Sequence, residues 1–351
     1  MSGGVDSSVA ALLLKRESYE VIGIHLKLFD DPLETDSITR TCCSIESAER
    51  ARQVCGILDI PFYVLNYREK FEETVIKPFA KSYIEGKTPN PCIACNRWVK
   101  FEFLLREMRA IGIDYLATGH YIRKIKDEDK WTLFRAKDLL KDQSYFLYML
   151  NQAMLDSLLF PNGDYEKKEI RKMASDAGLP VADVRESQDI CFVMAESYSS
   201  IIESMYPGCL KAGAIVDQSG KELGRHTGII NYTIGQRHGL RVSAPEPLYV
   251  LEIRPDENLI VVGRRDETFS KGLNFDEESF VSGMIPPDGM HIQVKIRYNA
   301  KPVIATFVGK TSDGFQILFE KSQAAVTPGQ AVVLYDGEKM LGGGTIIKAL
   351  S

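Results

Sequence analysis

Short apolar runs alternate with stretches of helical spacing along the first third of the chain. In the stretch 45–58, Ala48, Ala51, Val54 and Cys55 share one face of a helix, whereas the run 20–26 is short and apolar, as in a buried strand. This alternation predicts a parallel α/β sheet with right-handed crossovers and a ligand site at the carboxyl ends of its strands. The predicted helices are 9–14, 45–58, 69–85 and 99–111, and the predicted strands are 20–26, 61–65 and 115–118.

The pattern changes in the second half of the chain. Helical spacing continues through 143–156 and 167–177, and short alternating runs typical of strands follow from about residue 207, at 249–253, 259–262, 292–296 and 331–335. Glycine, proline, aspartate and asparagine separate these runs. We therefore predict three domains: an α/β domain over 1–206, a small β-rich domain over 207–267 and a C-terminal β-barrel over 268–351.

Composition narrows the class of protein. The 351 residues are 44% apolar and 26% charged, enough for a large core. No stretch approaches the roughly 20 apolar residues of a membrane span, and the N-terminus has no secretory signal pattern. Seven cysteines are too few for a disulfide scaffold of this length and suit a reducing compartment, so we expect a soluble cytoplasmic protein without membrane contact.

The charge of the chain is compatible with a nucleic-acid partner. The net charge of −5 argues against a protein covered in basic surface, although a local basic track remains compatible with it. Positive residues predominate between Lys77 and Arg109. A solvated helix face is the simpler explanation of this run taken alone.

The most informative local motif is the segment Ser2-Gly3-Gly4-Val5-Asp6-Ser7-Ser8, which directly precedes an apolar helix. Glycines allow close backbone approach to phosphate, hydroxyls add donors, and a helix N-terminus favours anions. Asp6 is a candidate partner for Mg²⁺. The segment has neither the lysine nor the spacing of a Walker loop. An ordinary turn with an N-cap is the alternative, but SGGxDS resembles the PP-loop of ATP pyrophosphatases, which adenylate a carbonyl oxygen and release pyrophosphate.

A strand normally leads into such a phosphate loop, yet Met1 immediately precedes Ser2. Either Met1 is internal to a longer natural chain, or the sheet lacks its central strand and has an unfilled slot. We predict the first.

Two segments carry cysteines of chemical interest. Cys92 and Cys95 form a Cys-x-x-Cys motif after two prolines, in a predicted loop ahead of a basic helix, where Arg97 and Lys100 favour a thiolate. The motif alone also fits half of a zinc site or a redox pair, and no second Cys-x-x-Cys or Cys-x-x-His follows it. Cys191 precedes an apolar run, a pattern that is also typical of a core residue. We predict structural roles for the remaining cysteines, Cys42, Cys43, Cys55 and Cys209.

Seven segments together, in this order, resemble the landmarks of the tRNA-specific 2-thiouridylase (MnmA) family. They are SGGVDSS, TPNPCIACN followed by VKF, LATGHY, KDQSYFL, SQDICF, HTGIINYTIGQR and AVTPGQAVVLYDGEKMLGGG. The resemblance spans essentially the whole chain and implies a PP-loop domain, a small central domain and a β-barrel. It implies an enzyme that adenylates the wobble uridine of tRNA with ATP, releases pyrophosphate and AMP, and inserts sulfur delivered as a cysteine persulfide. It also implies a persulfide relay protein or cysteine desulfurase as sulfur donor, and tRNAs for Lys, Glu and Gln as substrates.

The resemblance assigns roles to individual positions. Cys95 matches the family's nucleophile, and Cys191 matches the cysteine that carries the persulfide. The positions that match the ATP site are Met1, Ser2, Gly3, Gly4, Val5, Asp6, Ser7, Ser8, Leu26 and Gly119. The positions that match tRNA contacts are Asn90, Pro91, Cys92, His120, Lys141, Asp142, Gln143, Arg297, Tyr298 and Gln330.

Cys92 departs from the family pattern, because many members carry Asp there. If Cys92, Cys95 and Cys191 converge, three thiolates could instead hold an iron–sulfur cluster with one open iron. The persulfide route is the favoured hypothesis. Two alternatives from outside this family are another PP-loop tRNA modifier, of the lysidine or 4-thiouridine synthetase type, and an RNA-binding protein with a vestigial ATP site.

Overall fold

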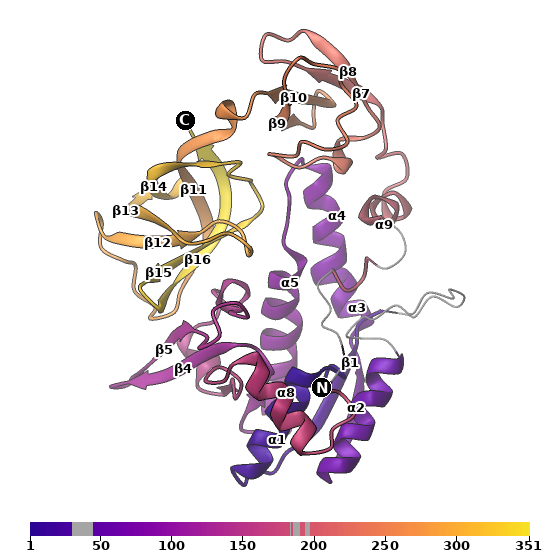
Figure 1. The fold of residues 1–351 in the computed structure, drawn as a ribbon, viewed down its shortest axis with the longest axis vertical. Coiled ribbons are helices and arrows are strands. Elements are labelled where there is room, and N and C mark those ends of the chain that lie inside the picture. Colours follow the sequence, from indigo (N-terminus) through magenta and orange to yellow (C-terminus); the bar gives the residue numbers. More distant parts are fainter. Residues whose placement is uncertain (30–44, 183, 185–189, 194–196) are drawn as a thin grey trace.

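The computed structural model describes residues 1–29, 45–182, 184, 190–193 and 197–351 (Figure 1). Cys42, Cys43 and the Ser187–Asp189 part of the SQDICF motif lie outside these residues. Along the long axis of the molecule, α1 (Val5–Arg16), α2 (Ile45–Leu58) and α8 (Lys167–Asp176) lie at one end and the strands of residues 213–263 at the other (Figure 1). The C-terminal barrel lies beside the long helices that join these two ends.

The N-terminal domain is α/β, as predicted. Strand β1 pairs in parallel with β2, and β3 pairs in parallel with β6. Its main helices and strands are α1 (Val5–Arg16), β1 (Gly23–Lys27), α2 (Ile45–Leu58), β2 (Phe62–Asn66), β3 (Leu116–Ala117), β6 (Leu158–Leu159), α8 (Lys167–Asp176) and α9 (Tyr198–Met205). Predicted helix 45–58 matches α2 at both ends, and the three predicted strands correspond to β1, β2 and β3.

Two long helices cross the middle of the molecule, and each contains a π-helical segment. The first consists of α3 (Arg68–Phe71), η1 (Glu72–Ile76) and α4 (Lys77–Ile84). The second consists of α5 (Pro91–Ala94), η2 (Cys95–Leu104) and α6 (Leu105–Ala110). Single-turn π-bulges are the usual form of this geometry and occur often at functional sites. The ten-residue η2 begins at Cys95, so this segment is a candidate for function.

The predicted helix at 143–156 is wrong. This stretch contains only η3 (Ser144–Phe146) and α7 (Gln152–Leu155), after a hairpin of β4 (Ile122–Asp127) and β5 (Lys130–Arg135) that the pattern did not indicate. Tyr145, Leu147 and Leu150 are fully buried in a cluster that also contains barrel residues. Their apolar character therefore reflects burial between domains rather than one face of a helix.

The C-terminal half is β-rich, as predicted. The central sheet has the strand order β8-β7-β10-β9, with β7 (Gly213–Val216), β8 (Glu222–His226), β9 (Tyr249–Arg254) and β10 (Leu259–Gly263), and the short η4 (Ile229–Asn231) and η5 (Asp266–Thr268) follow β8 and β10. Six strands then close a barrel in the order β11-β14-β13-β12-β15-β16, because β16 also pairs with β11. They are β11 (Phe269–Phe280), β12 (His291–Lys295), β13 (Val303–Thr311), β14 (Gly314–Ala324), β15 (Ala331–Asp336) and β16 (Lys339–Leu350).

The barrel is joined to the N-terminal domain by shared backbone pairing. Met340 on β16 pairs with Leu133 on β5, so the β4–β5 hairpin extends the barrel sheet. Within the barrel, a β-carbon on Gly344 would lie 2.4 Å from the Phe275 ring, which explains a glycine at this position. The hairpin and the barrel therefore form one continuous sheet of eight strands.

Candidate functional site

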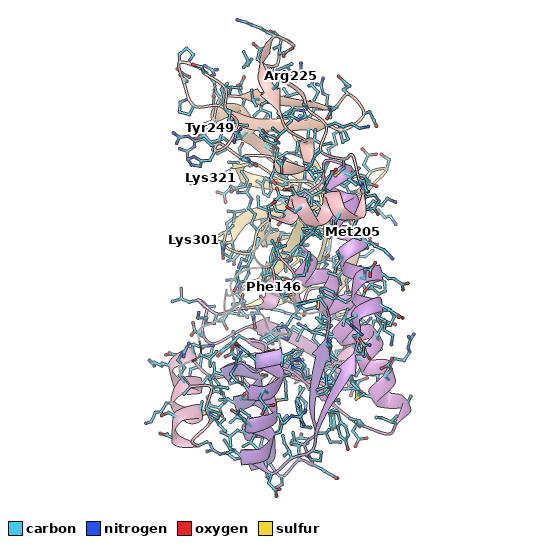
Figure 2. All side chains as sticks on the ribbon, turned by 90° about the vertical axis from the view of Figure 1, so that its right-hand side faces the viewer. Phe146, Met205, Arg225, Tyr249, Lys301 and Lys321 are labelled. Carbon is cyan, nitrogen blue, oxygen red and sulfur yellow. The ribbon has the colours of Figure 1, made fainter. Side chains whose placement is uncertain are left out.

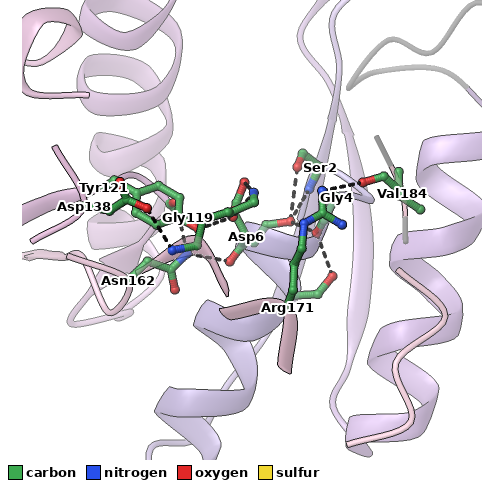
Figure 3. Close-up of polar contacts among 12 residues, drawn as sticks. Ser2, Gly4, Asp6, Gly119, Tyr121, Asp138, Asn162, Arg171 and Val184 are labelled. Carbon is green, nitrogen blue, oxygen red and sulfur yellow. Dashed lines mark hydrogen bonds and ion pairs between the residues drawn. The ribbon is translucent and has the colours of Figure 1, made fainter. Parts of the chain in front are cut away.

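The predicted phosphate loop wraps around the N-terminus of α1 (Figure 3). Gly4 is the N-cap, and its carbonyl accepts the hydroxyls of Ser7 at 3.2 Å and Ser8 at 2.9 Å. Gly3 has a φ of +71°, and a β-carbon there would lie 2.2 Å from the Ser47 carbonyl oxygen at the start of α2. These contacts hold a tight loop at a helix N-terminus, which is a favourable site for a phosphate group.

Asp6 is held by a lysine that the sequence did not point to. The Lys167 ammonium donates to both carboxylate oxygens of Asp6, at 2.7 and 2.9 Å, and the Tyr121 hydroxyl donates to one of them at 2.6 Å. Lys167 is 8% exposed. This arrangement makes Asp6 an anchor for Lys167 and does not fit the predicted role of Asp6 as a Mg²⁺ ligand, since its oxygens already bind a cation. It also places a lysine beside a loop that has none.

Gly119 packs directly against the loop. A β-carbon on Gly119 would lie 2.6 Å from the Asp6 carbonyl carbon and 2.7 Å from the Ser7 nitrogen. The fully buried Asn162 side chain donates to the Asp6 carbonyl at 2.9 Å and to the Gly119 carbonyl at 3.1 Å (Figure 3). The structure therefore brings the loop and Gly119 together, as predicted for one nucleotide site. Leu26 lies on β1 next to His25, whose ring contacts the Met1 carbonyl at 2.9 Å.

The two thiols lie on a helix and not in a loop ahead of one. The Asn90 side chain caps the N-terminus by accepting the amides of Cys92 at 3.1 Å and Ile93 at 3.4 Å, and Pro91 occupies the first helical position. The helix that was predicted to begin at 99 therefore begins eight positions earlier, at Pro91. Prolines disfavour helix interiors but are common at this first position, which the sequence pattern alone did not resolve.

Cys92 and Cys95 have different surroundings. Cys92 is exposed, whereas Cys95 is 8% exposed and belongs to the largest hydrophobic cluster. Cys191 packs against the same cluster, and its neighbour Phe192 contacts the rings of Phe71 at 5.8 Å and Phe79 at 5.2 Å between centroids. Among the described residues, no three His, Cys, Asp or Glu side chains gather as a metal site, so the three thiols do not fit a preassembled cluster ligand set.

Cys55 and Cys209 agree with their predicted packing roles. Cys55 is buried on α2, and burial raises the pKa of its thiol. Cys209 packs against the same cluster as Cys95 and donates to the Glu203 carboxylate at 3.0 Å. Burial and this carboxylate raise the Cys209 pKa to about 11. Neither environment favours a reactive thiolate.

One side chain next to Gly119 contacts the helix that carries Cys92 and Cys95. His120 follows Gly119, its Nδ1 lies 2.8 Å from the Thr118 hydroxyl, and its ring centroid is 6.0 Å from that of Phe101 on η2. Burial, with a smaller contribution from the Lys100 charge, holds the pKa of His120 well below its ordinary value. His120 is therefore neutral at pH 7, so one of its ring nitrogens donates a hydrogen bond and the other accepts one.

The predicted tRNA-contacting turn at 141–143 is built around a buried carboxylate. Asp142 is 5% exposed and accepts the Ala136 amide at 3.1 Å and the Ser144 hydroxyl at 2.8 Å. Gln143 accepts the Tyr121 amide at 3.0 Å. Asp142 thus shapes the turn, and Lys141 beside it is only partly buried.

The barrel contributes the other predicted tRNA contacts. The rings of Tyr298 and Phe146 are in contact, with centroids 4.4 Å apart and planes inclined by 40°. Phe146 lies near mid-height of the molecule (Figure 2). Arg297 donates to the carbonyls of Ala324, at 3.0 Å, and Ala325. No sequence pattern indicated Lys295, whose ammonium lies 5.5 Å from the Tyr298 ring centroid and whose pKa is lowered by burial.

Thr88, just ahead of the thiol helix, contacts both of the other domains. Its amide donates to the Pro328 carbonyl at 3.0 Å, its carbonyl accepts the Gln330 side chain at 2.8 Å, and its hydroxyl lies 3.3 Å from that of Thr233. A β-carbon on Gly329 would lie 3.0 Å from the Thr88 nitrogen and oxygen. All three domains therefore meet at the loop that leads to Cys92 and Cys95.

Several site residues were missed from sequence, namely Lys167, Tyr121, Asn162, Lys295 and Arg171, whose guanidinium donates to the carbonyls of Ala182 and Val184. Tyr121 had a weak signal, because it ends the LATGHY motif that also contains Gly119 and His120. Lys167 and Arg171 lie one turn apart on α8, which reads as an ordinary charged amphipathic helix. Only the tertiary contacts identify them.

The described residues include no helix with the length and apolar character needed to cross a membrane.

Three family models match the chain. They are described as the tRNA methyl transferase HUP domain over residues 1–195, the tRNA methyl transferase PRC-barrel domain over 207–264 and the aminomethyltransferase beta-barrel domain over 270–346.

Curated relatives named tRNA-specific 2-thiouridylase MnmA match over the full chain. The protein of Carboxydothermus hydrogenoformans is 46% identical over 100% of this chain and 97% of its own length. Those of Clostridioides difficile (strain 630) and Clostridium botulinum (strain Alaska E43 / Type E3) are 45% and 44% identical, covering 100% and 99% of this chain and 97% and 96% of their own lengths. A solved structure of NMN synthetase from Francisella tularensis aligns with a TM-score of 0.34 and 15% identity, covering 58% of this chain and 74% of its own, too weak a likeness to carry an argument.

Proposed function

The chain belongs to the tRNA-specific 2-thiouridylase (MnmA) family, and from this premise we propose that it is a tRNA-uridine 2-sulfurtransferase. ATP adenylates the 2-carbonyl oxygen of the wobble uridine, and sulfur from a cysteine persulfide replaces that oxygen. The observation that carries this proposal is that Cys191 packs against the hydrophobic cluster that contains Cys95. Cys95 lies on the same helix as Phe101, whose ring contacts that of His120 next to Gly119.

The first half-reaction needs a site for the phosphates of ATP. The N-terminus of α1 offers backbone amides and the positive end of the helix dipole, and Gly119 leaves room for close approach to the loop. The uridine 2-oxygen attacks the α-phosphorus, and pyrophosphate leaves. Since Asp6 is paired with Lys167, we propose that any Mg²⁺ accompanying ATP is bound mainly by phosphate oxygens and water.

The second half-reaction uses the two thiols in fixed roles. The terminal sulfur of the Cys191 persulfide forms a bond to uridine C2, and AMP leaves with the original oxygen. The Cys95 thiolate then attacks the Cys191 sulfur, which breaks the persulfide S–S bond, completes the 2-thiouridine and leaves a Cys95–Cys191 disulfide. An external dithiol, or two thiols, supplies the two electrons that reduce this disulfide for the next turnover and is itself oxidised to a disulfide.

We propose that the tRNA lies across the N-terminal domain and the barrel. Asn90, Pro91 and Cys92 would lie beside the target base, and Lys141, Arg297 and Gln330 would contact the backbone. The proposed substrates are tRNAs for Lys, Glu and Gln, and the proposed sulfur source is a persulfide relay protein or cysteine desulfurase. Cytoplasmic location follows from these substrates as an expectation.

Nucleoside analysis tests the function directly. In cells that lack this protein, 2-thiouridine derivatives in tRNA should disappear and return when the gene is restored. Purified protein with ATP should release pyrophosphate only when tRNA is present. A lysidine or 4-thiouridine synthetase would change a different nucleoside, and an RNA-binding protein with a vestigial site would release no pyrophosphate.

Cys92 separates the persulfide route from a cluster route. Cys92 is exposed, whereas Cys95 is buried with the Cys191 segment, so we expect Cys92→Ser to retain much of the thiolation activity. The protein should be purified anaerobically, with iron and sulfide quantified in the parent and in Cys92→Ser. Stoichiometric iron that is lost together with thiolation in Cys92→Ser would establish the iron–sulfur alternative with Cys92, Cys95 and Cys191 as ligands.

A further inference from the structure

The central domain exposes a group of basic side chains on one loop, residues 237–241, which we call the basic loop. Arg237, His238 and Arg241 are exposed, and among the residues that the structure describes no hydrogen bond or ion pair holds their side chains. The surrounding stretch 231–248 contains one acidic residue, Glu246. Arg237 ends the HTGIINYTIGQR segment, to which the proposed reaction assigns no role.

The backbone of the basic loop is fixed from both ends. Leu240 is only 4% exposed and belongs to the largest hydrophobic cluster. The Gln236 side chain accepts the Thr233 amide at 3.0 Å and donates to the His238 carbonyl at 3.0 Å. Arg241 has a φ of +53°, which is uncommon for a residue other than glycine. The exposed cations are therefore carried by a braced backbone.

The turn just before the basic loop lies at the junction of the three domains. The Thr233 hydroxyl is 3.3 Å from that of Thr88, which leads to the thiol helix. A β-carbon on Gly235 would lie 2.3 Å from the β-carbon of Ala325 in the barrel, and the Ala325 carbonyl accepts a hydrogen bond from Arg297. The basic loop therefore adjoins both the entry to the thiol helix and the barrel segment that holds Arg297.

The spacing along the chain keeps these cations close to the junction. Arg237 follows Gly235 by two positions, so their α-carbons lie within about 7 Å of each other. An arginine presents a planar fork of N–H donors that matches the oxygens of a phosphate group. Because no described carboxylate occupies the donors of Arg237 and Arg241, both are available to an anionic ligand.

We propose that the basic loop binds phosphate groups of the tRNA backbone, so that the central domain takes part in substrate binding together with the other two domains. A polynucleotide is favoured over an acidic protein because the loop adjoins Arg297 and the segment that leads to Asn90, which are both proposed tRNA contacts. An acidic face of the sulfur donor is the alternative that the test distinguishes. The inference rests on the proposed sulfurtransferase function.

The test measures equilibrium binding of unmodified tRNA to the full-length protein at several salt concentrations. For Arg237→Ala and for Arg241→Ala we expect the affinity near about 0.1 M salt to fall by about three- to tenfold. The slope of log K against log salt should become less steep by about one in each variant, because one phosphate contact is lost. Arg237→Lys keeps the charge and should keep the slope of the parent.

A matched control comes from the same domain. Arg254→Ala removes an exposed arginine that is paired with Glu252 at 2.9 Å, and it should change neither the affinity for tRNA nor the slope. The affinity for ATP should be the same in all variants. Persulfide loading by a cysteine desulfurase should proceed at the rate of the parent in Arg237→Ala and Arg241→Ala.

Three outcomes overturn the inference. It is wrong if either Arg237→Ala or Arg241→Ala keeps the slope of the parent, and slower persulfide loading in that case would assign the loop to the sulfur donor. It is also wrong if Arg254→Ala lowers the slope equally, because net charge would then explain the effect. It is wrong, too, if Arg237→Lys lowers the slope as much as Arg237→Ala. Failure of the proposed function gives a different result, since the parent protein itself would then release no pyrophosphate with tRNA.

Discussion

The nucleotide loop and the thiol helix are held in place in different ways. Contacts to the loop come from Arg50, Gly119, Asn162 and Lys167, which all belong to the N-terminal domain. The thiol helix begins next to Thr88, which is held by the central domain and by the barrel as well. The adenylation half of the proposed site is therefore built within one domain, whereas the sulfur half depends on how three domains dock.

This difference suggests how the two half-reactions respond to change. Damage confined to the N-terminal domain near the loop should affect both steps, because sulfur transfer needs an adenylated uridine. Damage at the domain junction should affect sulfur transfer more than adenylation. The predictions below test that division, beginning with the largest expected effect.

Replacing the persulfide-carrying thiol should stop sulfur transfer alone. In Cys191→Ser we expect 2-thiouridine formation to fall by about 1,000-fold or more, because a hydroxyl cannot carry the persulfide, with pyrophosphate release retained. Cys209→Ser is the matched control, since the Cys209 thiol packs against the same cluster and its pKa is raised to about 11. Loss of pyrophosphate release in Cys191→Ser would show that the two halves are not separable.

Adding one methyl group beside the loop should damage both steps. In Gly119→Ala the new carbon meets the backbone of Asp6 and Ser7 below 3 Å, so the loop must shift. We expect destabilisation of about 1–3 kcal/mol, typical of overpacking, and a drop in tRNA-dependent pyrophosphate release of about 100-fold, typical of misplaced reacting groups. Urea unfolding and a pyrophosphate assay measure the two effects.

Gly56→Ala is the control for this change. A β-carbon on Gly56 meets nothing within 4 Å, and the position lies inside α2. Alanine is preferred to glycine in a helix by roughly 0.5–1 kcal/mol, so this variant should be slightly more stable and fully active. Full activity in Gly119→Ala would mean that the loop does not form the nucleotide site.

Disturbing the junction should slow sulfur transfer selectively. In Gly329→Ala the new carbon would crowd the Thr88 backbone at 3.0 Å, whereas in Gly337→Ala, also a barrel glycine with positive φ, it meets nothing within 4 Å. The φ angles are +89° at Gly329 and +59° at Gly337, so both variants carry backbone strain of about 1–3 kcal/mol. We expect only Gly329→Ala to lower the rate of 2-thiouridine formation, by about tenfold. Equal rates of 2-thiouridine formation in the two variants would show that the domain junction at Thr88 does not affect sulfur transfer.

Acid should lower the stability of the fold through His120, whose ring contacts that of Phe101. The pKa of His120 is lowered in the folded protein, chiefly by burial, so the neutral ring contributes stability above the unfolded pKa of about 6.5. That contribution is lost as pH falls from about 6.5 toward the lower folded pKa, by up to about 1.4 kcal/mol per pH unit.

Urea unfolding between pH 7.5 and 5.5 measures this effect. His120→Gln should show a smaller loss of stability than the parent. His226, whose pKa is also lowered by burial in the central domain, contributes in the same direction, so His226→Gln identifies its share. An unchanged pH dependence in His120→Gln would show that His120 does not carry this effect.

The smallest expected effect concerns tRNA affinity. If the backbone lies across both domains, the affinity should fall steeply with salt, and Lys141→Ala should reduce the slope of log K against log salt by about one. Affinity for ATP should stay constant in this variant, and Lys172→Ala serves as the control for a lost surface charge. A salt-independent affinity of the parent would argue against an RNA substrate.

Local sequence patterns were sufficient to predict much of the α/β and barrel architecture. Helix α2 was predicted at both ends because its apolar face repeats at helical spacing, and the nucleotide loop was recognised because its glycines and hydroxyls are contiguous. The pattern failed at 143–156, where Tyr145 and Leu150 are buried beneath the barrel. The apolar residues of this stretch are buried by residues that are distant in the sequence, so their spacing does not follow a helical or strand period.

The sequence by itself determined which residues are candidates for the chemistry: the phosphate loop, Cys95 and Cys191. Tertiary structure alone decided their surroundings, because the Asp6–Lys167 pair and the Thr88 junction join positions far apart in the chain. It also showed that Cys95 is buried while Cys92 is exposed, since helix capping by Asn90 starts the helix at Pro91 and turns the two thiols toward different environments. Contacts between distant residues depend on packing, which leaves no periodic signal in the sequence.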